Sequence, residues 1–238
     1  MPWRIHILDG APELTGYTGG DEVYDLPEDS LPQIKVKWFR SQDGEQWFPY
    51  VDDHPIVWTG GASETDLAFT EDGAVIAVLR NEAGDAEGFG SLICRGEPGS
   101  LADWTCARDL KRYDSPLVFS HGGRIWLMGR RNLTETGAYD LQMTDLSYTQ
   151  QYLQYQIAYW NAPKRCALWE IDATTLAVEW VLDLPSRGDT CFVSVLPEAD
   201  GSYSVYNYSS DPEGPDLSWL DGQNGVTRIY RQQLWLPD

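Results

Sequence analysis

Short apolar runs separated by turn signals alternate along most of this chain, and helical periodicity is nearly absent. The runs are rich in Val, Ile, Leu, Trp, Tyr and Phe, which favour strands, and Gly-containing pairs typical of hairpin turns separate them. These pairs are Asp43-Gly44, Gly60-Gly61, Asp72-Gly73, Gly122-Gly123, Asp200-Gly201 and Asp221-Gly222. The pattern therefore predicts an all-β protein.

The hydrophobic pattern also repeats. In DLAFTEDGAVIAVLRNE (66–82), a Phe lies four residues before the turn glycine and an Arg lies seven after it. SPLVFSHGGRIWLMGRRN (115–132) keeps this spacing, and CFVSVLPEADGSYSVYNYSS (191–210) is a looser copy. A second, less apolar hairpin follows each of them. Two hairpins in about 50 residues are typical of a β-propeller blade, which has four antiparallel strands.

Four blades are expected, at 1–58, 59–110, 111–183 and 184–236. In the first blade only the outer hairpin, from Gln33 to Tyr50, is clear. The segment 134–163 is predicted to be an insertion into the third blade that covers the channel mouth. We predict a single propeller domain over 1–238, with four visible blades and room for a fifth, or a piece of a larger propeller. A multi-sheet sandwich is the alternative. The expected inner strands are 66–70, 75–80, 116–120, 124–129, 191–196 and 202–207.

Several segments resemble the sialidase-like, or BNR-repeat, propellers. RSQDGEQW (40–47) is similar to their Asp-box, although it departs by one residue from S-x-D-x-G-x-T-W, and an Asx-type hairpin turn is the alternative. The Arg-Ile-Pro element that opens sialidase domains is not present. The resemblance covers about 64–236 and implies a glycosidase-type propeller. It is carried by ETDLAF (64–69), RNE (80–82), YDSPLVF (113–119), GRRN (129–132), GDT (188–190) and NYSSD (207–211).

The balance of charge excludes two classes of partner. The chain has 37 acidic and 17 basic side chains and a formal charge of −20. Nucleic acids and anionic membrane surfaces are bound by basic surfaces. No apolar run approaches the ~20 residues of a membrane span, and the N-terminus lacks a signal-peptide pattern. We expect no nucleic acid, no membrane insertion, and a protein that is cytoplasmic or secreted with its leader missing from this chain.

Histidines and cysteines are too few and too scattered for a zinc site. There are three histidines and four cysteines, and no CxxC pair. No spacing supports a Ca²⁺ site either. We therefore expect neither a metal nor a cofactor. Cys94 and Cys106 can face each other across a hairpin, but buried free thiols are the commoner state and are expected here.

Blade topology selects one end of the molecule for chemistry. The start of the first strand and the end of the second lie at the same end of each blade, and the long connections emerge there, whereas the other end has only tight turns. Blades two to four place these residues at that end: Glu64, Thr65, Asp66, Arg80, Asn81, Glu82; Tyr113, Asp114, Ser115, Arg130, Arg131, Asn132; Arg187, Asp189, Thr190, Tyr206, Asn207 and Tyr208.

Carboxylates at this end suit glycoside hydrolysis. Most glycosidases use two carboxyl groups, one as acid and the other as base or nucleophile, and sialidases use a Tyr backed by a Glu. Tyr208 and Glu82 are the nearest such pair by position. The candidate catalytic residues are Asp66, Glu82, Asp114, Asp189 and Tyr208. We expect one cavity near the channel axis, lined by Asp66, Arg80, Glu82, Asp114, Arg130 and Asp189.

Arginines and aromatic residues supply candidate substrate contacts. Guanidinium groups bind carboxylates of sialic or uronic acids, or they pair with the chain's own acids, and both interpretations stay open. Aromatic rings and amides in the insertion suit sugars, or they pack the loop onto the propeller. Tyr148 to Tyr159 recur at three and four residues, which indicates a short helix. The candidate substrate-binding residues are Arg80, Arg130, Arg131, Asn132, Arg187, Tyr155 and Trp160.

The leading hypothesis from the sequence is a glycoside hydrolase, exo-sialidase-like, that acts on a carboxylated or otherwise decorated sugar or glycoconjugate. The alternative is a propeller that binds carbohydrate or protein without catalysis. Asn132-Leu133-Thr134 and Asn207-Tyr208-Ser209 match the glycosylation sequon, but both lie at the candidate site, so we interpret them as chance matches.

Overall fold

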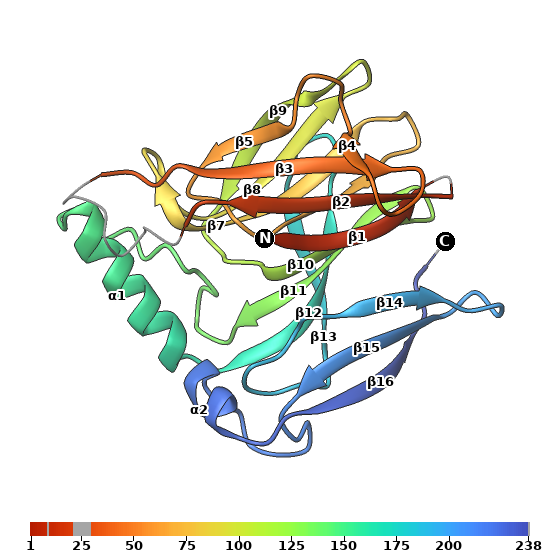
Figure 1. Cartoon of the computed structure of the whole chain (residues 1–238). Helices are drawn as coiled ribbons and strands as arrows, with labels where there is room; N and C mark the ends of the chain where they lie inside the picture. Colours follow the sequence, from red (N-terminus) through yellow and green to blue (C-terminus); the bar gives the residue numbers. More distant parts are fainter. Residues whose placement is uncertain (9, 21–29, 238) are drawn as a thin grey trace.

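The computed structural model describes residues 1–8, 10–20 and 30–237. Strands make up 53% and helices 9% of it. Four antiparallel sheets follow one another along the chain, and each forms one blade (Figure 1). The predicted all-β propeller is confirmed. No described helix is both long enough and apolar enough to cross a membrane.

The first blade contains an inner hairpin that the sequence pattern did not reveal. β1 places Arg4 inward, where its guanidinium donates to the carbonyls of Ser115, Pro116 and Val193. On the opposite face of β1, Ile5 and Ile7 are 61% and 70% exposed. Strands usually turn their apolar residues toward the protein interior and their charged residues toward solvent. β1 does the reverse, so its hydrophobic pattern did not identify it as an inner strand. The strands are β1 (Pro2–Leu8), β2 (Ala11–Thr18), β3 (Ile34–Ser41), β4 (Trp47–Pro49) and β5 (Ile56–Gly60), which pairs back onto β3.

The second and third blades follow the predicted pattern closely. Each has four strands in sequence order, and each inner hairpin turns at the expected glycine. The insertion leaves the third blade between its second and third strands and contains helix α1 (Tyr148–Asn161), so the expected helix is confirmed. The strands are β6 (Thr65–Phe69), β7 (Val75–Asp85), β8 (Gly88–Glu97), β9 (Ser100–Asp109), β10 (Asp114–His121), β11 (Arg124–Asn132), β12 (Lys164–Ile171) and β13 (Val178–Leu184).

The last blade has three paired strands among the described residues. Its inner strand begins three residues later than expected, because Cys191 has a φ of 82° and breaks the extended backbone before Ser194. A short helix precedes the outer strand and contacts α1. The elements are β14 (Ser194–Pro197), β15 (Tyr203–Ser209), α2 (Trp219–Asn224) and β16 (Arg228–Leu234).

Carboxylates connect the second blade to the third. β10 is the edge strand of its sheet, so backbone N–H groups on its unpaired side are available to the second blade. The N–H of Ser115 donates to Glu64 over 2.8 Å, and that of Val118 donates to Asp66 over 2.6 Å. A hydrogen bond contributes about 0.5–1.5 kcal/mol, and more when the acceptor is ionised, so these two contacts stabilise the position of β10 beside the second blade.

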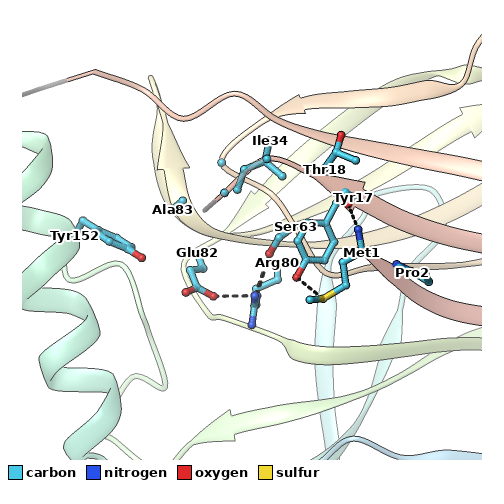
Figure 2. A pocket seen from close by; sticks show the side chains of 13 residues that line it. Met1, Pro2, Tyr17, Thr18, Ile34, Ser63, Arg80, Glu82, Ala83 and Tyr152 are labelled. Atoms are coloured by element: carbon cyan, nitrogen blue, oxygen red, sulfur yellow. Dashed lines mark hydrogen bonds and ion pairs between the residues drawn. The ribbon is translucent and has the colours of Figure 1, made fainter. Parts of the chain in front are cut away.

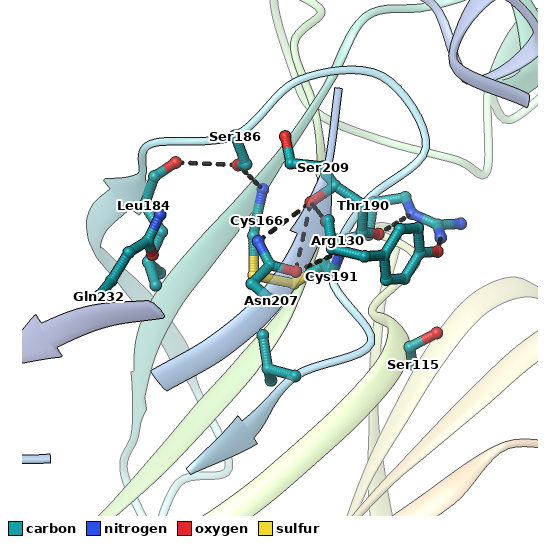
Figure 3. The surroundings of a disulfide bond; sticks show 12 residues. Ser115, Arg130, Cys166, Leu184, Ser186, Thr190, Cys191, Asn207, Ser209 and Gln232 are labelled. Atoms are coloured by element: carbon teal, nitrogen blue, oxygen red, sulfur yellow. Dashed lines mark hydrogen bonds between the residues drawn. A yellow bond between two sulfur atoms is a disulfide. The ribbon is translucent and has the colours of Figure 1, made fainter. Parts of the chain in front are cut away.

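Both pairs of cysteines form disulfides, which corrects the expectation of free thiols. Cys94 and Cys106 are register partners on β8 and β9 with Cα atoms 4.0 Å apart. Cys166 on β12 is bonded to Cys191, which precedes β14, over a Cα separation of 4.8 Å (Figure 3). The second bond joins two blades, and sequence spacing holds no information about such a contact.

The turn at 40–47 is ordered by one carboxylate. Asp43 Oδ1 accepts hydrogen bonds from the N–H groups of Glu45 and Gln46 over 2.9 and 2.8 Å. Ser41 Oγ accepts one from the N–H of Gly44 over 2.9 Å. These backbone hydrogen bonds lower the pKa of Asp43. This is the geometry of an Asx-type turn, the alternative given for the Asp-box-like segment.

Candidate functional site

Asp114 lies at the centre of an ion-pair network at the predicted end of the blades. Its oxygens lie 2.5 Å from Arg112 Nε and 3.1 Å from Arg130 Nη1, and the hydroxyl of Tyr159 donates to it. A third guanidinium, that of Arg80, is 3.5 Å away. The side chain of Asp114 is fully buried. Burial alone raises a carboxyl pKa, but the three guanidinium groups hold the pKa of Asp114 far below its ordinary value.

Arg80 joins two glutamates to this centre. Arg80 Nη1 lies 2.7 Å from Glu64 Oε1, and Arg80 Nε lies 3.0 Å from Glu82 Oε2. Arg112 Nη2 lies 3.0 Å from the same oxygen of Glu82. Gln156 Nε2 on α1 donates to the other Glu82 oxygen over 2.8 Å. Because Arg80 and Glu82 are two residues apart in β7, they share one face of the strand.

The two glutamates have pKa values displaced in opposite directions. Burial raises the pKa of Glu64, and this outweighs the opposing effect of Arg80. Burial also acts to raise the pKa of Glu82, but Arg112 and Arg80 together reverse the shift and lower it. Neighbouring carboxyl groups whose environments separate their pKa values are the usual arrangement of an acid and a base in glycosidases.

The third part of the network belongs to the last blade. Arg130 Nη2 lies 2.7 Å from Asp189 Oδ1, and Arg130 Nε donates to the carbonyl of Thr190 over 2.7 Å. The hydroxyl of Tyr208 donates to Asp189 and accepts from Arg130, each over 3.0 Å. Figure 3 shows Arg130 and Thr190 beside the disulfide of Cys191. The disulfide therefore anchors the segment that Arg130 binds.

Helix α1 supplies the polar groups that cover the network. Ser147 begins the helix with a capping box, since its side chain accepts from the N–H of Gln150 and its own N–H donates to the Gln150 side chain. Gln156 and Tyr159 are three residues apart on one face and reach Glu82 and Asp114. Arg112 Nη1 also donates to Gln156 Oε1 over 3.0 Å.

A cavity of about 740 Å³ opens beside Arg80 and Glu82. Tyr152 of α1 lies on one side of this cavity and Tyr17 of β2 on the other, with Ser63 beside Arg80 (Figure 2). The side chains of Arg80 and Glu82 are 16% and 19% exposed, whereas that of Asp114 is 1% exposed. Arg80 and Glu82 are therefore the members of the network that also line this cavity.

Comparison with known proteins shows which solved structures have a similar fold. No protein-family model matches the sequence, and no curated protein matches it. Among solved structures, the endo-arabinase of Bacteroides thetaiotaomicron has a TM-score of 0.52 at 9% identity, over 100% of this chain and 75% of that one. The phage phi92 endosialidase has a TM-score of 0.56 at 13% identity, over 100% of this chain and 36% of that one.

A third similar structure is a family 117 glycoside hydrolase of the marine bacterium Zobellia galactanivorans. It has a TM-score of 0.52 at 10% identity, over 98% of this chain and 65% of that one. The chain has the fold of the glycoside hydrolase β-propellers. Its likeness to the BNR-repeat sialidases in particular is not confirmed.

Six of the twelve predicted site residues come together, and the other six lie elsewhere, four of them polar residues with other partners and two of them aromatic residues of the insertion. Arg80, Glu82, Asp114, Arg130, Asp189 and Tyr208 belong to the network described above. Asp66 pairs with His6 over 2.6 Å instead. Arg131 pairs with Asp183 over 2.7 Å, and Arg187 with Asp216 over 3.1 Å. The Asn132 side chain donates to the carbonyl of Ala138, and both sequon asparagines, Asn132 and Asn207, are buried.

The arginines and aromatic residues are engaged within the protein. Every arginine proposed to bind a substrate carboxylate forms an ion pair with an acidic residue of the chain itself. Of the two interpretations given for the arginines, the structure contains the internal pairing. Tyr155 is fully buried against Phe89 with a ring-centroid distance of 5.1 Å. Trp160 stacks on Trp219 of α2 over 6.2 Å. Packing therefore accounts for the two aromatic residues selected from the insertion.

Four members of the network were not among the site residues selected from the sequence. They are Glu64, Arg112, Gln156 and Tyr159. A signal existed for Arg112, which lies two residues before Asp114 and so on the same side of an extended chain. No signal existed for Gln156 and Tyr159, because the docking of α1 decides which of its residues reach the rim. Among the described residues, no group of three or more His, Cys, Asp or Glu side chains is placed to hold a metal ion.

Proposed function

We propose that this protein is a glycoside hydrolase that binds a sugar in the cavity beside Arg80 and Glu82. The observation that carries the proposal is a pair of glutamates on one guanidinium. Glu64 and Glu82 both contact Arg80, with oxygens 2.7 and 3.0 Å from it. Two carboxyl groups that share one guanidinium are at most roughly 8 Å apart, which is below the upper limit of the ~5–9.5 Å span of glycosidase pairs.

The roles follow from the electrostatics. Glu82, whose pKa is lowered by Arg112 and Arg80 in spite of burial, is the ionised carboxylate that acts as base or nucleophile. Glu64, whose pKa is raised by burial, is the proposed proton donor. It does not itself line the cavity, but its side chain is 10% exposed and it contacts Arg80, which does. Asp114 is too deeply buried to reach a substrate, and its role is to hold the guanidinium groups in place.

The sialidase-type mechanism has less support. A tyrosine nucleophile needs activation toward the phenolate. Burial raises the pKa of Tyr208 to about 12, and its partners are Asp189 and Arg130 rather than Glu82. A carboxylated sugar also has less support than an uncharged one, because Arg80 already contacts two carboxylates.

A panel of fluorogenic glycosides tests the proposal. The panel contains arabinosides, xylosides, galactosides, uronides and sialosides, and the proteins are the wild type, Glu82→Gln, Glu64→Gln and the exposed control Glu45→Gln. We expect Glu82→Gln and Glu64→Gln to lower kcat/KM on the active substrate by about 10²–10⁴-fold, the contribution of a positioned acid or base. The control keeps wild-type activity.

The pH profile separates the two roles. Activity falls at low pH as Glu82 is protonated and at high pH as Glu64 ionises, so Glu64→Gln removes the limb at high pH. If no glycoside in the panel is hydrolysed, the catalytic proposal is wrong. Saturable sugar binding that Glu82→Gln abolishes would then support the alternative, a propeller that binds carbohydrate without catalysis.

A further inference from the structure

The side-chain amide of Gln156, on α1, contacts three polar groups of the candidate site. Its Nε2 donates to Glu82 Oε1 over 2.8 Å and to the hydroxyl of Tyr152 over 3.2 Å. Its Oε1 accepts from Arg112 Nη1 over 3.0 Å, and the residue is 2% exposed. A flipped amide would place its oxygen against the carboxylate and its NH₂ group against the guanidinium. The neighbours therefore fix the orientation of this amide.

The two oxygens of the Glu82 carboxylate have different surroundings. Oε2 lies 3.0 Å from Arg80 Nε and 3.0 Å from Arg112 Nη2, and this oxygen is buried. The Glu82 side chain as a whole is 19% exposed and lines the cavity of about 740 Å³. Figure 2 shows one oxygen of Glu82 directed at Arg80 and the other on the side of Tyr152. The oxygen that is open to the cavity is therefore Oε1, which Gln156 holds.

The contacts also make Oε1 the more reactive oxygen of Glu82. A carboxylate oxygen has two lone pairs, and it needs one of them to attack a sugar carbon or to take a proton from water. The two guanidinium groups in contact with Oε2 are cations and withdraw its electron density, whereas Oε1 is held by a neutral amide. The hydrogen bond from Gln156 uses one lone pair of Oε1, so the second lone pair remains for the reaction.

We infer that Oε1 is the reacting oxygen of Glu82 and that Gln156 is the positioning residue that directs it into the cavity. Gln156 does so through one donated hydrogen bond, while Arg112 and Tyr152 hold the amide itself in place. The inference rests on the proposed function, in which Glu82 is the base or nucleophile. The part that α1 plays is then to fix the geometry of this carboxylate.

Replacing Gln156 with Met removes the hydrogen bond and nearly keeps the size of the side chain. The loss of a hydrogen bond to a charged group corresponds to about 10–100-fold in a rate constant. We expect Gln156→Met to lower kcat on the active glycoside by this factor and to leave KM unchanged, because the amide contacts the carboxylate rather than the sugar. The matched control is Gln154→Met, the same change at an exposed position of α1, which keeps the wild-type kcat.

The pH profile distinguishes positioning from a merely structural contribution. Burial acts to raise the pKa of Glu82, and the nearby arginines and the Gln156 hydrogen bond lower it. Loss of that bond therefore raises this pKa, and the low-pH limb of the activity profile moves to higher pH in Gln156→Met. A lower melting temperature with the limb in its wild-type place overturns the inference. The other titratable groups that act on Glu82 are Arg80, Glu64, Arg112, Asp114 and Tyr139.

If Gln156→Met keeps the wild-type kcat and limb, this inference is wrong, while loss of activity in Glu82→Gln still supports the proposed function. Should Gln156→Met fail to fold, Gln156→Glu takes its place, and the same directions are expected because a second carboxylate beside Glu82 also raises its pKa.

NMR decides the inference if no glycoside is hydrolysed and the proposed function fails. The carboxyl ¹³C signal of Glu82, assigned by its absence in Glu82→Gln, is followed against pH in the wild type, Gln156→Met and Gln154→Met. A higher titration midpoint in Gln156→Met than in the other two proteins supports the positioning of Oε1 by Gln156. Equal midpoints in the three proteins overturn it.

Discussion

Replacing Asp114 with Asn tests whether the ion-pair network stabilises the fold. The substitution keeps the shape of the side chain and removes its charge. Asp114 lies 2.5 Å from Arg112, 3.1 Å from Arg130 and 3.5 Å from Arg80, and it is fully buried. In the variant, three guanidinium groups remain close together around a neutral amide whose NH₂ group must itself face a donor.

Removing one partner of a buried ion pair costs about 3–5 kcal/mol of the free energy of unfolding. A chain of 150–250 residues loses ~2–4 °C in melting temperature per kcal/mol, so Asp114→Asn should melt roughly 6–20 °C lower. The pKa of Asp114 is lowered in the fold, so its contribution is present above the unfolded pKa of about 3.9 and is lost only in stronger acid.

Urea unfolding followed by far-UV circular dichroism, at pH 5 and pH 8, gives the free energies. The control is Asp103→Asn, which makes the same change in net charge at an exposed position. The difference between the two variants should be about 3–5 kcal/mol and equal at both pH values. A difference below about 1 kcal/mol would refute the reasoning that these contacts act as a buried network rather than as surface pairs.

Three further predictions concern the rest of the fold. Cys166→Ser opens a loop of 25 residues and should lower the free energy of unfolding by about 3 kcal/mol in calorimetry, whereas Cys94→Ser, with a loop of 12, should cost less. Burial opposes but Asp66 raises the pKa of His6, so its contribution is full below about pH 6.5 and fades as the pH rises through the folded value. Chemical unfolding should therefore show a greater loss for His6→Gln at pH 5 than at pH 9, and an equal loss at both would contradict this. Gly61→Ala would place Cβ 1.9 Å from a backbone carbonyl oxygen, and the soluble folded yield should fall sharply.

The sequence by itself determined the repeating hairpins and the end of the molecule that holds the polar groups. Alternation of apolar residues and turn glycines is a local property, so it located β6, β7, β10, β11 and most of β15. The position of Arg80, Glu82, Asp114 and Arg130 at one rim followed from strand order alone, because antiparallel hairpins bring the start of one strand beside the end of the next.

Only the tertiary structure decided which of those polar groups meet. Whether Arg130 pairs with Asp114 and Asp189, and whether Asp66 instead meets His6, depends on how neighbouring blades pack. The disulfide between Cys166 and Cys191 has the same origin. These contacts join segments far apart in the chain, and local pattern contains no record of the distances between them. Each charged side chain interacts most strongly with the charged groups that packing brings within a few ångströms of it. Which acids and arginines pair at the rim is therefore decided by how the blades pack against one another.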